Sequence, residues 1–130
     1  MLMNQSRYAE ALPIIKRSYR LIRPNAPKYA KVLCLANLAW AFYKLNQLDS
    51  AIFYSKQALI LEPKRLDFWI DLAHQYLLKK DTISSFENLN NFLLHGGDPK
   101  LVFNDTALTN SLGKYPQMKI LKDTYLELEN

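Results

Sequence analysis

The sequence predicts an all-α fold, and three observations lead to this prediction. Apolar residues recur at spacings of three and four along almost the whole chain, and no segment of any length alternates with period two. Short turns containing proline, asparagine or glycine separate segments of helical length. The pattern around Leu38 recurs around Leu72, one period of a helical repeat later. With 130 residues, the chain has the size of a single domain covering 1–130.

The first predicted helix covers residues 8–22 and forms half of a helical pair, because too few residues precede Tyr8 for a partner helix. Pro13 should either kink this helix or mark its true start. Its apolar arc is wider than a single neighbouring helix can cover. The residues of this arc are Ala11, Leu12, Ile14, Ile15, Ser18, Tyr19, Leu21 and Ile22.

Residues 28–63 form the next predicted element, a complete helical pair. Its first helix starts near Lys28 and ends around Leu45. Asp49 is expected to cap the second helix, because its carboxylate can accept a hydrogen bond from a free backbone N–H. This helix ends before Pro63, which has no N–H with which to continue it.

A second complete pair is predicted over residues 64–97. Its first helix begins at either Lys64 or Leu66, after Pro63, and runs to about Lys79. The start of its second helix has two alternatives, a cap by Asp81 or a capping box formed by Ser84 and Glu87. The segment HGGDP ends this helix, since glycine tolerates the left-handed geometry of a helix C-terminus and proline prevents resumption.

Residues 99–130 are predicted to form a helical cap. A short helix ended by Gly113 is followed by a last helix, which Pro116 opens and which runs towards Leu128. Terminal caps of helical arrays need one apolar and one polar side. The apolar side comprises Phe103, Leu108, Leu112, Met118, Leu121 and Tyr125. The polar side comprises Lys119, Lys122, Asp123 and Glu127.

Equivalent positions in the two complete pairs carry similar side chains at one constant spacing. The matched positions are Leu38 and Leu72, Ala39 and Ala73, Phe42 and Tyr76, and Ala51 and Ser85. This period and pattern resemble the tetratricopeptide repeat, a pair of antiparallel helices that stacks into a right-handed α-solenoid. The family signature is matched by Trp69, Leu72, Ala73 and Tyr76 in one pair and by Phe42, Ala51, Ala58 and Pro63 in the other.

The resemblance implies about two full repeats with an N-terminal half repeat and a C-terminal helical cap, as in small bacterial proteins of this family. Ser55 departs from the family pattern because an aromatic residue is usual at its position. Phe92 also departs, because it stands where a small residue is usual. The large side chain indicates that this repeat packs against a cap.

Composition and charge exclude several classes of protein. The only cysteine, Cys34, lies in an apolar run and reads as a buried hydrophobe, so a reducing cytoplasm is the expected location. Neither an export signal nor a membrane span is predicted.

The net charge is +5, and no acidic residue occurs between Ala11 and Leu48. The basic residues of the first helix form a predicted exposed ridge, which either is simply solvated or contacts nucleic acid. They are Lys16, Arg17, Arg20 and Arg23.

In the family, the first helices of successive repeats line a groove that binds a peptide or a helix of a partner. The resemblance therefore implies a partner-binding groove, with aromatic residues as anchors. The groove residues would be Asn37, Trp40, Tyr43, Lys44, Asp67, Ile70, Asp71 and His74. The alternative for Trp40 is a partly buried place in the core.

The chemistry of this groove bears on the ligand. Asn37 matches an asparagine with which the family holds a C-terminal carboxylate, but Asp67 and Asp71 replace the expected basic residues and would repel that ligand. A partner segment with a lysine or arginine and apolar side chains is expected instead. His74 shares the face of these carboxylates, but a zinc site requires more ligands in a closed geometry. We therefore predict neither a metal nor another cofactor.

The leading hypothesis is a non-catalytic adaptor or chaperone that binds a protein segment. One alternative is a protein associated with nucleic acid through the basic ridge. Another is self-association, in which the apolar arc of the first helix, through Leu12, Ile14 and Tyr19, pairs with the same helix of a second copy.

Overall fold

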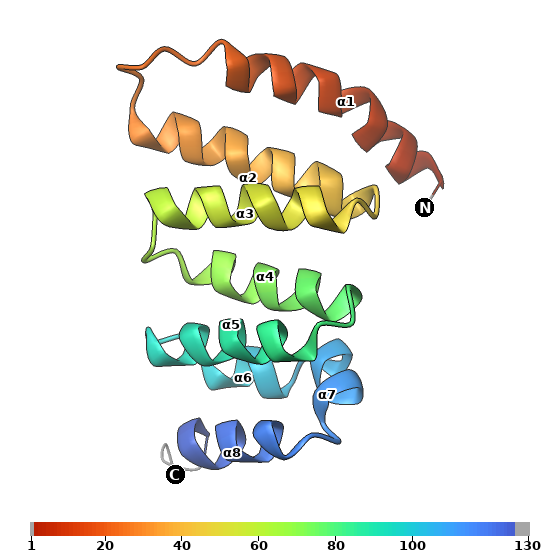
Figure 1. Cartoon of the computed structure of the whole chain (residues 1–130), viewed down its shortest axis with the longest axis vertical. Helices are drawn as coiled ribbons and strands as arrows, with labels where there is room; N and C mark the ends of the chain where they lie inside the picture. Colours follow the sequence, from red (N-terminus) through yellow and green to blue (C-terminus); the bar gives the residue numbers. More distant parts are fainter. Residues whose placement is uncertain (1, 127–130) are drawn as a thin grey trace. The chain divides into compact units, whose positions relative to one another are not determined.

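The predicted all-α fold class is confirmed. The computed structural model describes residues 2–126 and contains eight α-helices and no strand in that range (Figure 1). Within each of its compact units, neighbouring helices pack against one another, as in solenoid-like folds. The chain divides into two compact units, an N-terminal unit (Met1–Phe68) and a C-terminal unit (Trp69–Asn130).

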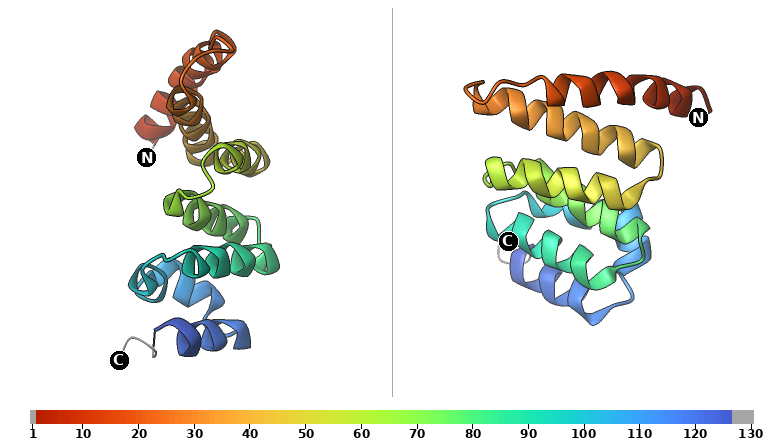
Figure 2. Two further views of the ribbon diagram at one scale, coloured as in Figure 1. Left: turned by 90° about the vertical axis from the view of Figure 1, so that its left-hand side faces the viewer. Right: turned by 45° about the horizontal axis from the view of Figure 1, so that its top comes forward.

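The N-terminal unit contains three long helices, α1 (Leu2–Arg20), α2 (Lys28–Lys44) and α3 (Leu48–Leu61). The helix α2 lies beside both α1 and α3 (Figure 2). The three helices share a cluster of buried side chains, which consists of Leu12, Leu38, Ala41, Phe42 and Ala51. Partly buried side chains pack around this cluster and are mostly aromatic, namely Tyr8, Ile15, Tyr43, Leu45 and Tyr54. The bounds of α2 and α3 agree with the predicted helices of residues 28–63.

The helix α1 begins at Leu2, earlier than predicted, and runs through Pro13 to Arg20. Pro13 therefore does not mark the start of the helix. Leu12 and Ile15, which flank it, pack into the core cluster, and such packing outweighs the unfavourable helix propensity of one proline. Ile14 is 67% exposed, so within its unit α1 is covered on one side of its apolar arc only.

The prediction that Asp49 caps α3 is wrong. Gln47 occupies the N-cap position of α3, and its side chain makes no capping hydrogen bond. Asp49 lies in the first turn instead. A negative charge there is still favourable, because the positive end of the helix dipole is close.

The turns that precede α3 and α5 (Thr82–Leu94) have the same backbone geometry, at equivalent positions of the two helical pairs. Asn46 and Lys80 both adopt the left-handed conformation, with φ of 60° and 65°. The N-cap residues that follow them, Gln47 and Asp81, have φ of −95° and −94° and ψ of 77° and 83°. The sequence repeat is therefore also a repeat of local backbone structure.

The C-terminal unit contains most of α4 (Leu66–Leu78) and all of α5, α6 (Pro99–Phe103), α7 (Thr106–Leu112) and α8 (Pro116–Tyr125). Its fully buried side chains include Leu72, Leu89, Val102, Leu108 and Leu112. A buried hydrogen bond connects α5 to α4, because the Ser85 hydroxyl donates to the Ala73 carbonyl oxygen over 2.8 Å. The polar atom of this small residue is thereby satisfied inside the core.

Of the two alternatives for the start of α5, the structure selects Asp81. Its carboxylate accepts hydrogen bonds from the backbone N–H of Ser84 over 3.1 Å and from the Ser84 hydroxyl over 2.8 Å. The capping box of Ser84 and Glu87 does not form, because Ser84 already lies inside the helix and donates back to Asp81.

The predicted end of α5 is confirmed. Gly96 has a φ of +95°, which a residue with a Cβ rarely adopts, and Pro99 opens α6. Gly97 is required for packing, because a Cβ there would collide with the Phe92 ring. Phe92 is buried, so the side chain that departs from the small-residue pattern is part of the core of the unit.

The predicted short helix that Gly113 ends is confirmed as α7, but a separate short helix, α6, precedes it and was not predicted. Asn104 ends α6, and the side chain of Asp105 caps α7 by accepting from the Leu108 N–H over 3.1 Å. A chain that stops and restarts at two polar residues can turn. The predicted start of the last helix at Pro116 is confirmed. The predicted end at Leu128, and Glu127, lie outside the described residues.

Candidate partner-binding surface

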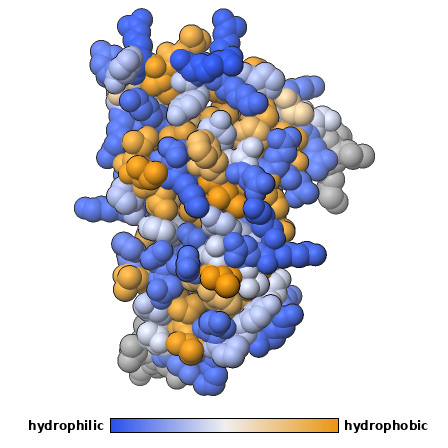
Figure 3. All heavy atoms as spheres, in the orientation of Figure 1, coloured by the Kyte–Doolittle hydropathy of each residue, from blue (hydrophilic) through white to orange (hydrophobic). Residues whose placement is uncertain are grey.

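The helix α2 has two chemically different faces in the N-terminal unit. One face supplies the buried residues Val32, Leu35, Leu38, Ala39, Ala41 and Phe42. On the other face large apolar side chains remain accessible: Tyr29 is 72% exposed, Leu33 57% and Trp40 46%. Together with Asn37, Tyr43 and Lys44, these three residues form what we call the α2 surface. The space-filling view shows hydrophobic side chains reaching the molecular surface among hydrophilic ones (Figure 3).

Trp40, Tyr43 and Lys44 form a stack at one end of this surface. The Trp40 and Tyr43 rings stack with centroids 5.6 Å apart and an interplanar angle of 28°. The Lys44 ammonium lies 4.6 Å from the centroid of the Trp40 ring and 5.8 Å from that of Tyr43, distances at which a cation is attracted to the ring face. The stack is thus preorganised, and a ligand would meet it in a fixed shape.

Trp40 is also connected to α1, because its Nε1–H donates a hydrogen bond of 3.0 Å to the Tyr8 hydroxyl oxygen. The Trp40 ring is therefore partly held by the protein and partly accessible. It has features of both alternatives, an anchor in the groove and a partly buried residue of the core. The contact joins two residues that lie 32 positions apart, on consecutive helices, and no local signal points to it.

At the other end of the α2 surface lies a hollow of about 410 Å³. Tyr29, Leu33 and Ala36 of α2 line one side, and Glu62 and Arg65, which follow α3, line the other. The hollow is bordered by an ion pair between Lys28 Nζ and Glu62 Oε1, 3.1 Å apart. Apolar side chains of a ligand would fit here, while the charges at its edge are paired.

Asp67 was predicted to present a negative charge to a partner, but Arg65 already engages it. The two side chains form paired hydrogen bonds, with Arg65 Nε at 2.9 Å from Oδ1 and Arg65 Nη2 at 2.8 Å from Oδ2 of Asp67. These bonds hold the pKa of Asp67 below its usual value. Arg65 was not among the predicted site residues, although its position two residues before an aspartate at a helix start was a usable signal.

The remaining predicted groove residues belong to α4 in the C-terminal unit. Ile70 and Asp71 are half-buried. His74 is engaged within the unit, because its Nε2 lies 2.9 Å from Oδ2 of Asp105. Within residues 2–126, no group of three or more histidine, cysteine, aspartate or glutamate side chains is placed to hold a metal ion.

All four residues of the predicted basic ridge, Lys16, Arg17, Arg20 and Arg23, are exposed. Arg17, Arg20 and Arg23 make no ion pair with other residues that the structure describes. The ammonium of Lys16 also lies 5.3 Å from the centroid of the Phe42 ring, at the edge of the N-terminal core. Its long side chain reaches along the helix surface to the aromatic cluster.

The residues predicted for self-association differ in their accessibility. Leu12 is buried in the core cluster of the N-terminal unit and is not available to a second copy, which corrects its assignment. Tyr19 contacts the edge of the Tyr54 ring, with centroids 6.4 Å apart. Ile14 is exposed. A dimer through α1 would therefore rest on Ile14 and neighbouring side chains.

A scan against models of known protein families gives no match for this chain. A search of curated proteins gives no significant match either. In the described part of the chain, no helix combines the length and the apolar character that crossing a membrane requires.

Proposed function

We propose that this chain is a cytoplasmic adaptor or chaperone of the tetratricopeptide type, which binds a peptide or a helix of a partner protein without catalysing a reaction. The observation that carries the proposal is the α2 surface. Tyr29, Leu33 and Trp40 remain accessible although α2 has a separate buried face for the core. Accessible apolar residues concentrated on one helix face are typical of sites that bind other proteins.

The matched turns before α3 and α5 support the assignment to the tetratricopeptide type. Their backbone angles agree at the spacing of the sequence repeat. The small residues Ala51 and Ser85, at the same spacing, are both fully buried. A period shared by sequence, backbone and packing is what a repeat fold requires.

The α2 surface favours a segment with apolar side chains. Leu33 and the hollow beside it would bind one such side chain, and the face of the Trp40 and Tyr43 stack would bind another. Lys44 would favour a carboxylate or a carbonyl oxygen of the partner close to the stack. Because Arg65 engages Asp67, we no longer expect the predicted lysine or arginine of the partner to pair with that carboxylate.

The proposal can be tested with a random peptide library selected on the purified chain. The affinity of each selected peptide would be measured by fluorescence anisotropy for the wild type, for Leu33→Glu and for Ile60→Glu. Ile60 is the matched control, since it is an exposed apolar residue of α3 outside the α2 surface. We expect Leu33→Glu to weaken binding about tenfold or more, because a buried charge in the hollow is unfavourable.

Peptides that bind Leu33→Glu as tightly as the wild type would argue against the α2 surface as the binding site. Tyr43→Ala provides a second variant at the other end of the surface, and Trp40 fluorescence in a Trp69→Phe background reports on ligands that contact the stack.

Binding of nucleic acid through Arg17, Arg20 and Arg23 is a second candidate function, favoured by the exposure of these three side chains. It predicts binding of a single-stranded oligonucleotide that weakens steeply with salt, because phosphate contacts release counterions. Arg20→Glu with Arg23→Glu should abolish such binding and leave peptide binding to the α2 surface unchanged. An oligonucleotide affinity that these reversals leave intact would exclude this function.

A further inference from the structure

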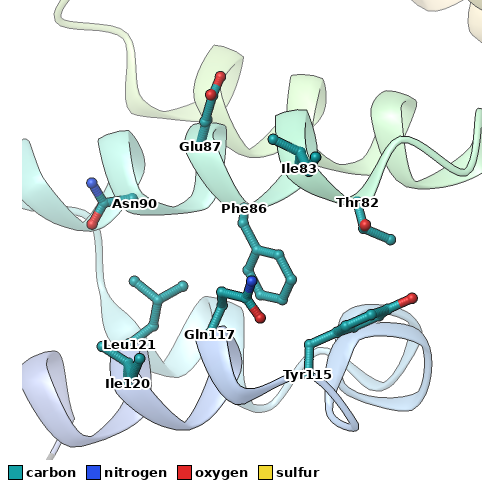
Figure 4. A pocket seen from close by; sticks show the side chains of 9 residues that line it. All are labelled: Thr82, Ile83, Phe86, Glu87, Asn90, Tyr115, Gln117, Ile120 and Leu121. Carbon is teal, nitrogen blue, oxygen red and sulfur yellow. The ribbon is translucent and has the colours of Figure 1, made fainter.

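A second depression lies entirely within the C-terminal unit, between α5 and α8. It has a volume of about 440 Å³. Phe86 extends from α5 towards α8, and Leu121 extends from α8 towards α5 (Figure 4). Both side chains are buried, whereas Ile83 and Ile120 at the rim are 73% and 62% exposed. We call this apolar depression the α5–α8 trough.

A hollow of about 690 Å³ adjoins the trough. Thr82 and Tyr115 line both depressions, so the two form one continuous surface. Tyr115 is held in place at this junction by an edge contact with Phe86, with ring centroids 6.0 Å apart. A ligand could therefore extend from one depression into the other across a fixed aromatic ring.

The charges along this surface are separated. Lys80 and Lys114 line the hollow, and no acidic residue in the described part of the chain does so. Among the residues that the structure describes, Glu87 is the only charged one that lines the trough. Neither lysine makes an ion pair with another residue that the structure describes, and the Lys114 ammonium lies 5.4 Å from the centroid of the Tyr115 ring. Positive charge thus accumulates at one end only.

We propose that the trough and the hollow together bind one short acidic and apolar segment of a partner protein. Its apolar side chains occupy the trough beside Phe86 and Leu121, and its carboxylates lie in the hollow at Lys80 and Lys114. Charge complementarity identifies this occupant and fixes its direction, because Glu87 repels the acidic end from the trough. The site goes beyond the proposed function, since it shares no residue with the α2 surface.

A nucleic acid fits this surface less well than a peptide. Two lysines neutralise few phosphates, and Glu87 would face the backbone of any strand that followed the trough. An apolar depression between two helices is instead the usual receptor for alternating apolar side chains of a helix or an extended segment.

The same peptide library tests this site when the selected peptides are measured on variants of the C-terminal unit. Ile83→Ser with Ile120→Ser removes the apolar rim, and Lys80→Glu with Lys114→Glu reverses the charge. The matched controls are Leu101→Ser, an exposed leucine of α6, and Lys100→Glu, an exposed lysine of the same helix. All four positions in the test variants are at the surface, and thermal unfolding would verify that each variant is folded.

We expect the selection to return peptides that combine apolar residues with aspartate or glutamate. Each test variant should weaken their binding about tenfold or more, and the controls should not. Peptides with lysine in place of the acidic residues should bind the Lys80→Glu and Lys114→Glu variant better than the wild type, which a merely structural effect would not produce.

The proposal is overturned if no selected peptide is sensitive to these variants, or if the sensitive peptides lack acidic residues. It is also overturned if a single-stranded oligonucleotide, but no peptide, loses affinity on charge reversal. A concentration-dependent dimer that Ile83→Ser with Ile120→Ser dissociates would assign the surface to a second copy instead. Leu33→Glu affects only the α2 surface. A failure of the proposed function can therefore be distinguished from a failure of the site in the trough and hollow.

Discussion

The two compact units stabilise their helices in different ways. In the N-terminal unit, α1, α2 and α3 have 19, 17 and 14 residues, and neither α2 nor α3 has a side-chain capping bond at its start. In the C-terminal unit, α5, α6 and α7 have 13, 5 and 7 residues and an aspartate caps each of them, whereas α8, with 10 residues, begins at Pro116 without a side-chain capping bond. These caps are Asp81, Asp98 and Asp105.

For α6 and α7, the capping agrees with the cost of starting a short helix. A helix shorter than about 12 residues has few internal hydrogen bonds to offset nucleation, so satisfying the free N–H groups at its start matters more. Long helices gain more from packing, and the N-terminal unit packs them through rings such as Phe42, Tyr43 and Tyr54. We therefore expect core substitutions to dominate in the first unit and local substitutions to be more damaging in the second.

The largest effect is expected from truncating the core of the N-terminal unit. Phe42 is buried and stacks on Tyr54 with a centroid distance of 5.6 Å. Phe42→Ala should lower the free energy of unfolding by about 3–5 kcal/mol, because it leaves a cavity. Urea denaturation followed by Trp40 fluorescence in a Trp69→Phe background would measure this, and Phe53→Ala, at an exposed ring on α3, is the control. A similar loss for both variants would contradict the prediction.

Gly97→Ala tests the tight packing after α5 in the C-terminal unit. The added methyl group would collide with the Phe92 ring, and overpacking of this kind costs about 1–3 kcal/mol. Thermal unfolding of Gly97→Ala, Phe92→Leu and the double variant would form a mutant cycle. The double variant should be more stable than the sum of the single losses predicts. Additive losses would show that the two residues do not compete for the same space.

Asp105 has two roles, as the cap of α7 and as the partner of His74. Asp105→Ala should cost about 1–2 kcal/mol, because the Leu108 N–H loses its acceptor. Asp105→Asn should cost less, since asparagine also caps helices, and the remaining loss reports on the contact with His74. Chemical denaturation at pH 7 would compare the two variants. Equal losses would show that the contact with His74, and not the cap, accounts for the effect.

Asp81 should make the start of α5 sensitive to acid. The hydrogen bonds from the Ser84 N–H and the Ser84 hydroxyl lower its pKa below the usual 3.8. A lowered pKa means that the stabilisation is complete above pH 3.8 and is lost as the pH falls through the pKa of the folded state. Asp81→Ala should therefore be less stable than the wild type at pH 7, and the difference should shrink below this value. A difference that is constant with pH would contradict this account.

The smallest expected effect is a gain in the N-terminal unit. Gln47 has nearly the backbone angles of Asp81, and Ser50 follows it at the spacing at which Ser84 follows Asp81. Gln47→Asp should recreate the missing cap of α3 and stabilise the protein by about 0.5–1 kcal/mol. Gln47→Ala is the control, and thermal unfolding is the measurement. No gain over the wild type would show that backbone angles alone do not define this cap.

Several features followed from the sequence alone. The helical periodicity of apolar residues predicted the all-α fold, and prolines and glycines predicted where α3 and α5 end. The repeat of the sequence indicated equivalent turns, which the structure places at Asn46 and Lys80. These features depend on local chemistry, namely which backbone conformations and hydrogen bonds a residue permits, and local chemistry can be read along the chain.

Only the tertiary structure decided which side chains remain accessible. The engagement of Asp67 by Arg65, the contact of Trp40 with Tyr8, and the burial of Leu12 depend on which helix faces meet. The α5–α8 trough brings Phe86 together with residues of a helix much further along the chain. The spacing of apolar residues in the sequence therefore does not predict it. Accessibility is what remains after each helix has buried one face, and the packing of distant segments determines it.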